Sequence, residues 1–108
     1  MSERRQVRVA QSFFDRLDDL LPPERGPRGQ PSTVDFLLHE MPTIIDGLAQ
    51  DYETVTAALT ELPEVRVLIT AGLLIPYIAV YAVVAVDGAV EIIYLEIDNN
   101  VPESSSEL

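Results

Sequence analysis

The longest apolar stretch of the chain covers residues 67–86 without one charged side chain and leads into Asp87 and Gly88. A stretch of this length reaches the lower part of the range of about 17–25 residues that crosses a bilayer as a helix. It is rich in valine and isoleucine, however, and Gly72 and Pro76 interrupt it, which is typical of strands and turns. An Asp-Gly pair between apolar segments favours a tight hairpin. We therefore predict paired strands, with a small membrane-inserted protein as an alternative for residues 67–86.

Three strands are predicted in this half of the chain: residues 65–71, a strand from Ile75 or Tyr77 to Val86, and residues 89–97. Short connections favour an antiparallel meander. Strict alternation along the last strand places Val90, Ile92 and Tyr94 on one face and Glu91, Ile93, Leu95 and Ile97 on the other. Both faces are largely apolar, so one must cover the helices and we expect the other to meet a partner.

The first part of the chain predicts a short strand and a helix. Residues 6–10 alternate weakly, which suits a strand. A helix is expected from Ser12, because Ser12 and Asp15 have the spacing of a capping box, and the prolines at 22 and 23 end it. Its apolar face consists of Phe13, Phe14, Leu17, Leu20 and Leu21.

A loop and a second helix follow. The segment PPERGPRGQP is too rich in proline and glycine for a regular element. Ser32 and Asp35 form another capping-box pattern, and the helix that starts there is expected to kink near Pro42 and to end at Pro63. Its apolar stripe consists of Ile44, Ile45, Leu48, Tyr52, Val55 and Leu59.

Length and pattern together predict a single α+β domain over residues 1–98 and an acidic, serine-rich, disordered tail over residues 99–108. The N-terminus carries no apolar core of the length that a secretory signal needs, so a cytoplasmic location is expected. The absence of cysteine excludes disulfides, thiolate metal sites and a thiol nucleophile.

The charge of the chain is strongly negative. Eighteen acidic residues oppose seven arginines, there is no lysine, and the formal net charge is −11. Such a chain lacks the cations with which nucleic-acid binders release counterions, and an acidic membrane surface is equally unsuitable. A basic protein surface is the partner that this charge would attract.

The order of elements resembles the RelE/ParE superfamily of small bacterial toxins over residues 6–98. QVRVAQSFFDRLDDL is similar to the first strand and helix of that family, and YIAVYAVVAVDGAVEIIYLEID to its tyrosine-containing hairpin. The resemblance implies the toxin half of a toxin–antitoxin pair. Family ribonucleases use basic residues around the sheet, whereas this chain has no Lys, Arg or His after Arg66 and continues with Asp98, Asn99 and Asn100 after the last strand. We therefore expect no nuclease activity; the ParE branch, associated with poisoning of DNA gyrase, depends less on those residues.

Candidate binding residues are Arg25, Arg28, Arg66, Tyr77 and Tyr81. The first two could grip a phosphate or carboxylate from a mobile loop, and the tyrosines could anchor a protein interface. His39 lacks a catalytic motif, and the acidic group Asp15, Asp18 and Asp19 is interpreted as a solvated helix face. Ser104, Ser105 and Ser106 belong to the tail. No catalytic residue, metal or cofactor is predicted, and we lean against an enzyme.

The sequence therefore predicts a toxin-like protein that acts by contact with an antitoxin-like or other basic protein. A non-toxic assembly module that forms a homodimer through its apolar sheet face is the alternative hypothesis from another class.

Overall fold

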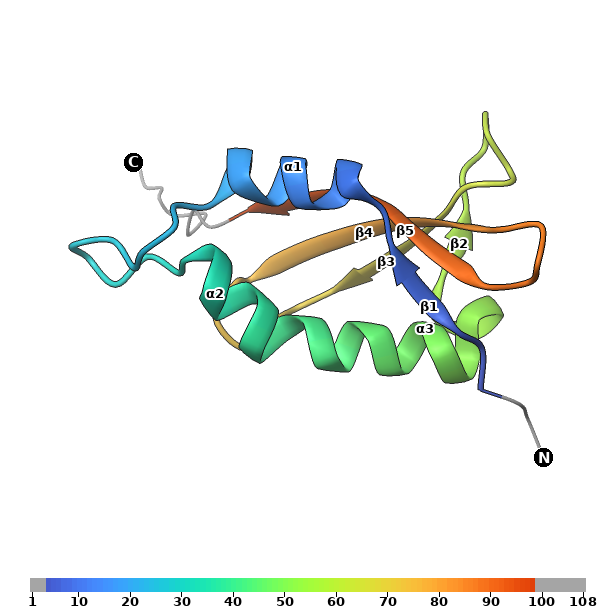
Figure 1. The fold of residues 1–108 in the computed structure, drawn as a ribbon, viewed down its shortest axis with the longest axis horizontal. Helices are drawn as coiled ribbons and strands as arrows, with labels where there is room; N and C mark the ends of the chain where they lie inside the picture. Colours follow the sequence, from blue (N-terminus) through green and yellow to red (C-terminus); the bar gives the residue numbers. More distant parts are fainter. Residues whose placement is uncertain (1–3, 99–108) are drawn as a thin grey trace, which may run out of the picture.

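The fold is built on one face of a mixed β-sheet, against which the helices pack (Figure 1). The computed structural model describes residues 4–98 and has an α+β architecture. In chain order the elements are β1 (Val7–Val9), α1 (Gln11–Leu20), α2 (Thr33–Asp35), the π-helical turn η1 (Phe36–Glu40), α3 (Met41–Val55), β2 (Ala57–Ala58), β3 (Arg66–Thr70), β4 (Tyr77–Val84) and β5 (Val90–Asp98). The predicted tail at residues 99–108 lies outside the described residues.

The described sheet has five strands in the order β1-β5-β4-β3-β2. β1 runs parallel to β5, and the other neighbouring pairs are antiparallel. The sheet is thus wider than the predicted meander, because β1 returns to a strand at the far end of the chain and β2 is too short to leave a sequence pattern. Residues 67–86 form most of β3, a loop and β4. Within residues 4–98, no helix combines the length and the apolar character needed to cross a membrane.

A β-bulge in β5 changes which face its second half presents. The register shifts between Tyr81 and Ala82 of β4, so Ile93 of β5 is an extra residue opposite them. After the bulge Leu95 is fully buried, whereas Tyr94 is 39% exposed. The strict alternation predicted for this strand was therefore wrong from Ile93 onward, and Tyr94 lies on the face away from the helices.

The predicted hairpin turn is present between β4 and β5. Gly88 has a φ of +90°, a backbone conformation that favours glycine. The Asp87 carboxylate accepts a hydrogen bond from the backbone N–H of Ala89 at 3.1 Å, and the N–H of Ala85 donates to the carbonyl of Ala89 at 2.8 Å. The Asp-Gly pair thereby fixes the turn.

The start of α1 differs from the prediction. The helix has no side-chain cap, so the capping box of Ser12 and Asp15 was wrong. The Ser12 hydroxyl instead donates to the carbonyl of Ile93 at 2.7 Å, and Nε of Arg16 donates to the carbonyl of Leu95 at 3.0 Å. α1 therefore covers the edge of β5 beyond the short strand β1, where free carbonyl groups need donors.

A long irregular helix is formed by α2, η1 and α3 in succession. Its predicted capping box is confirmed: the N–H of Asp35 donates to the Ser32 hydroxyl at 3.1 Å, and the N–H of Ser32 donates to the Asp35 carboxylate at 2.9 Å. The irregularity expected near Pro42 is the π-helical turn η1, after which Pro42 occupies the first turn of α3. Proline is tolerated there because the first turn leaves N–H groups unpaired in any case.

This helix ends at Val55, earlier than the predicted end at Pro63. Thr56 is extended, and its hydroxyl donates to the carbonyl of Tyr52 at 2.6 Å. Arg66 of β3 donates to the carbonyl of Thr56 at 2.9 Å and to its hydroxyl at 2.7 Å. The carbonyl group of Thr56, at the C-terminal end of α3, thus receives its hydrogen bond from a side chain ten residues further along the chain. The local sequence therefore did not reveal where the helix ends.

A single hydrophobic core joins the helices to the sheet. Its largest fully buried side chains are Phe13, Leu17, Phe36, Leu48, Ile75, Ile78, Val80, Val90, Ile92 and Leu95. The predicted helix stripes include Phe13, Leu17 and Leu48, because spacings of three and four residues place them on one face. Phe36 of η1 lies outside those stripes, and Leu59 of the predicted second stripe lies beyond the end of α3.

A buried carboxylate ties this helix to the loop between β3 and β4. Glu40, the last residue of η1, is only 4% exposed. Its carboxylate oxygens accept hydrogen bonds from the backbone N–H groups of Leu73, Leu74 and Ile75, at 2.8, 2.7 and 3.1 Å. An added Cβ at Gly72 would approach Oε2 of Glu40 to 2.6 Å. The loop therefore wraps closely around one charged group whose burial three donors compensate.

We expect Glu40→Ala to lower the free energy of unfolding by about 1–3 kcal/mol, because it leaves the buried N–H of Ile75 without an acceptor, whereas the N–H groups of the exposed residues Leu73 and Leu74 can bond to water. Urea unfolding followed by circular dichroism measures the loss. Glu61→Ala, which removes an exposed carboxylate, is the matched control and should change stability by less than about 0.5 kcal/mol. Equal losses in the two variants would contradict the role of Glu40.

Candidate interaction surface

The face of the sheet away from the helices carries a continuous group of apolar and aromatic side chains. This open face is defined by Val67 and Ile69 of β3, Tyr77, Ala79, Tyr81 and Val83 of β4, and Glu91, Tyr94 and Glu96 of β5, of which Ala79 is fully covered by its neighbours. Strand register places Val67, Tyr81 and Tyr94 in one row. Ile69 is 59% exposed and Tyr77 is 41% exposed. Exposed tyrosines beside aliphatic side chains are characteristic of protein interfaces.

Two tyrosines of the open face are held by polar contacts. The Tyr81 hydroxyl donates to Glu96 at 2.9 Å, and this hydrogen bond, followed by burial, raises the pKa of Tyr81. The rings of Tyr81 and Tyr94 meet edge to face, with centroids 5.8 Å apart. The Arg16 guanidinium lies 4.9 Å from the centroid of the Tyr94 ring. Both rings are therefore oriented in the free protein, which reduces the side-chain entropy that binding would cost.

Nearly all arginine side chains of the chain form ion pairs or hydrogen bonds within the protein. Ion pairs join Arg4 to Asp46, Arg5 to Glu53, Arg8 to Asp87 and Arg25 to Asp35. Arg16 and Arg66 donate to backbone carbonyl groups. Within residues 4–98, Arg28 is the arginine with neither kind of side-chain contact. The open face therefore offers a phosphodiester very little uncompensated positive charge.

The predicted binding residues fall into three separate places. Tyr77 and Tyr81 share the open face. Arg25 and Arg28 lie in the loop between α1 and α2, where Arg25 donates two hydrogen bonds to the carboxylate of the α2 capping box. Arg66 bonds the end of α3. Figure 1 places that loop at the opposite end of the long axis from β2, which pairs with Arg66, so Arg25 and Arg28 do not share a site with Arg66.

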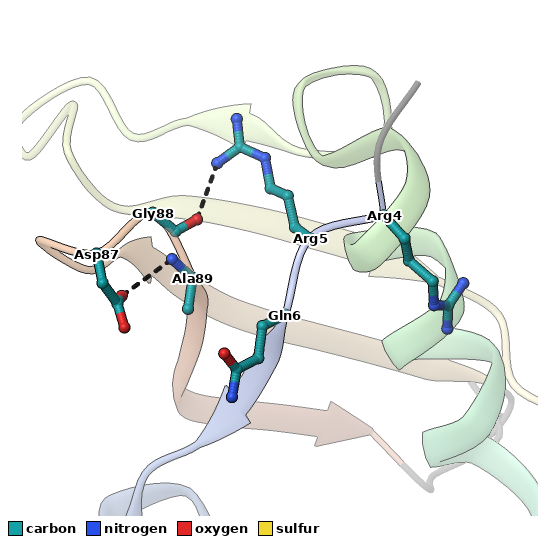
Figure 2. A pocket seen from close by; sticks show the side chains of 6 residues that line it. All are labelled: Arg4, Arg5, Gln6, Asp87, Gly88 and Ala89. Atoms are coloured by element: carbon teal, nitrogen blue, oxygen red, sulfur yellow. Dashed lines mark hydrogen bonds between the residues drawn. The ribbon is translucent and has the colours of Figure 1, made fainter. Parts of the chain in front are cut away.

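A hollow of about 640 Å³ beside the hairpin is lined by Arg4, Arg5, Gln6, Asp87, Gly88 and Ala89 (Figure 2). Arg5 donates to the carbonyl of Gly88 at 3.5 Å, and Figure 2 shows Arg4 directed away from the hairpin. Both arginines already have carboxylate partners. An anion that entered the hollow would therefore meet no unpaired arginine. The open face is the better candidate for a binding site.

The other residues considered from the sequence lie on the surface. His39 is exposed on η1, and Asp15, Asp18 and Asp19 form the exposed face of α1 that the amphipathic pattern predicted. In the part of the chain that the structure describes, no three His, Cys, Asp or Glu side chains group closely enough to hold a metal ion. The serines at 104–106 lie outside the described residues.

Sequence analysis did not identify Ile69, Glu96 or Arg16 as parts of the open face. Ile69 belongs to a continuous apolar run, in which nothing marks the exposed positions. The contact of Arg16 with Tyr94 depends on where α1 passes along β5. The one usable signal was the even spacing of Tyr77 and Tyr81, which places both on the same face of a strand.

Comparison with models of known protein families, with curated proteins and with solved structures finds no match to this chain. The candidate surface is therefore defined by geometry and chemistry alone, and the resemblance to RelE/ParE proteins stays a prediction.

Acid should weaken the ion pairs that hold the hairpin and the α2 cap. The hydrogen bond from Arg8, followed by that from the N–H of Ala89, lowers the pKa of Asp87 to about 2, and the contact with Arg25 holds the pKa of Asp35 below its usual range. A carboxyl group with a lowered pKa stabilises the folded state above its unfolded pKa of about 4, and this contribution is lost as pH falls.

We therefore expect Asp87→Asn, which keeps an acceptor for Ala89, to be less stable than the unmodified chain at pH 7, with the difference closing between about pH 4 and pH 2. Urea unfolding at a series of pH values measures it. Glu61→Gln, an exposed control, should show no such change. A difference that persists unchanged at pH 2 would refute the ion-pair contribution.

Proposed function

We propose that this chain is the toxin-like component of a toxin–antitoxin pair, with a RelE/ParE-like fold, and that it acts in the cytoplasm by contact with another protein. The observation that carries the proposal is the open face, where tyrosines and aliphatic side chains are exposed and already oriented. The order of strand, two helical segments and a C-terminal group of strands also supports it, because the resemblance rests on that order.

The chemistry of the open face favours a basic partner. Glu91 and Glu96 stand on the same face as Tyr94, and the chain as a whole carries a net charge of −11. A partner with apolar side chains at its centre and Lys or Arg at its rim would bury the tyrosines and neutralise the carboxylates. An antitoxin-like protein of this composition is the partner that we propose.

RNA cleavage is not part of the proposal. A phosphodiester that is being cleaved develops negative charge, which requires nearby cations for stabilisation. Two arginines reach the open face: Arg16 lies over a tyrosine ring, and Arg8, which is in register with Glu91, is already paired with Asp87. The carboxylates of Glu91 and Glu96 on that face would oppose the developing charge.

A homodimer through the open face is the second candidate function. The row formed by Val67, Tyr81 and Tyr94 favours it, because a flat apolar row can pack against its own copy. The carboxylates of Glu91 and Glu96 would then face a second negatively charged surface, so the basic partner is the stronger proposal.

Binding to the partner should depend on the tyrosines. We expect the tagged chain, co-expressed with the product of the adjacent reading frame, to retain that product on an affinity column. The double variant Tyr77→Ala with Tyr94→Ala should weaken binding by about 30-fold or more in calorimetry, because truncation of central aromatic residues costs about 2 kcal/mol or more.

Leu62→Ala is the matched control, since Leu62 is also an exposed apolar side chain but lies in the loop between β2 and β3. It should bind as the unmodified chain does. Equal binding by the tyrosine variant would exclude the open face. A stable dimer of the chain alone, lost in the same variant, would favour the assembly module.

Induced expression of the chain should slow growth, and co-expression of the adjacent product should restore it. The purified chain should leave RNA intact, because the open face lacks the cations for cleavage. Gel electrophoresis of incubated RNA checks the second point. RNA cleavage that disappears in a folded Arg66→Ala variant would contradict the proposal, and unaffected growth would argue against a toxin.

A further inference from the structure

A separate apolar groove runs between α3 and the outer edge of β3. One part has a volume of about 300 Å³ and is lined by Thr43, Ile44, Gly47 and Val55 of α3 and by residues 68–70. A second part of about 130 Å³ shares Thr43 and Ile44 with the first and continues along the loop that Glu40 holds. We call the two parts the α3–β3 groove.

Gly47 keeps this groove open. An added Cβ would lie 4.0 Å from side-chain carbons of Leu68 and Val55, an ordinary contact distance. Gly47 does not have a positive φ, so its backbone conformation does not require glycine. Glycine is also unfavourable inside a helix. The missing side chain therefore leaves space that a side chain from outside the protein can fill.

The edge of β3 beside the groove has backbone groups available for pairing. β2 pairs with Arg66 and Val67, and within residues 4–98 no strand lies beyond the remainder of β3. The N–H of Leu59 donates to the carbonyl of Val65 on the β2 side. Alternate residues of an antiparallel strand pair to the same side, so the N–H and carbonyl of Ile69 also point to this edge. An extended peptide can add to such an edge as a further strand.

The charge beside the groove favours a basic occupant. Asp51 is exposed and lies in sequence between Gly47 and Val55, which both line the groove, at a point where the backbone of α3 departs from helical geometry. Of the carboxylates on this helix, Asp46 and Glu53 form ion pairs with arginines, whereas Asp51 forms none with a residue of the described chain. A second copy of this chain, with its charge of −11, would be repelled.

We propose that the α3–β3 groove binds an extended basic segment of a partner protein. The segment adds as a strand to the edge of β3 at Ile69, places an apolar side chain at Gly47 and a lysine or arginine near Asp51. This site meets the open face at Ile69, but its other lining residues lie elsewhere, and it does not depend on the toxin–antitoxin assignment.

The test uses the full ¹⁵N-labelled chain and a synthetic peptide, Lys-Lys-Val-Thr-Val-Thr-Val-Lys-Lys, which combines an alternating centre with basic ends. We expect the peptide to shift the amide signals of Gly47 and Ile69. Gly47→Ala should fold with an equal or higher midpoint of thermal unfolding and should weaken binding by about tenfold, because its methyl group occupies the space of the incoming side chain. Tyr94→Ala, a control on the open face, should bind within a factor of about two.

The following results would overturn the proposal: failure of the basic peptide to bind at millimolar concentration, equal binding of the counterpart with glutamate in place of lysine, unchanged affinity of the folded Gly47→Ala variant, and signal shifts on the open face without a shift at Gly47. Concentration-dependent shifts at Gly47 without peptide would assign the groove to a second copy and would likewise overturn the basic partner.

Discussion

The contact between Glu40 and the loop from β3 to β4 is the interaction on which the arrangement of helix and sheet depends. A carboxylate this far from water is tolerated only when donors replace its hydration, and three successive loop N–H groups do so. The same bonds set where β3 ends and β4 begins. Glu40 and this loop line one part of the α3–β3 groove, and the loop leads directly into Tyr77 of the open face.

An acidic chain with few cations uses those cations mainly to hold itself together. Arg5 and Arg66 both lie over the ring of Tyr52, at 5.4 and 5.8 Å from its centroid, and so join the N-terminal segment, α3 and β3. Arg16 joins α1 to β5 in a similar way. The uncompensated charge that remains is negative. This balance leaves few cations for contacts with phosphate, and a net negative charge attracts basic surfaces at long range.

The two edges of the sheet differ in how completely other parts of the chain cover them. Beyond β1, Ser12 and Arg16 cover the outer carbonyl groups of β5, whereas β2 covers only the first residues of β3. Exposed strand edges invite pairing with other chains, and proteins usually block them. The uncovered part of β3 also borders both proposed surfaces, because Ile69 belongs to the open face and to the lining of the groove.

The sequence by itself determined the α+β composition, the hairpin at Gly88, the capping box at Ser32 and the irregular helix near Pro42, because each depends on residues close together in the chain. It also identified two tyrosines of the open face. Tertiary structure alone decided the rest: the bulge at Ile93, which exposes Tyr94, the burial of Glu40, and the end of α3 at Val55, beside which Arg66 donates to the carbonyl of Thr56. These features depend on partners ten or more residues away, and neither alternation nor helical spacing carries information about contacts at that separation.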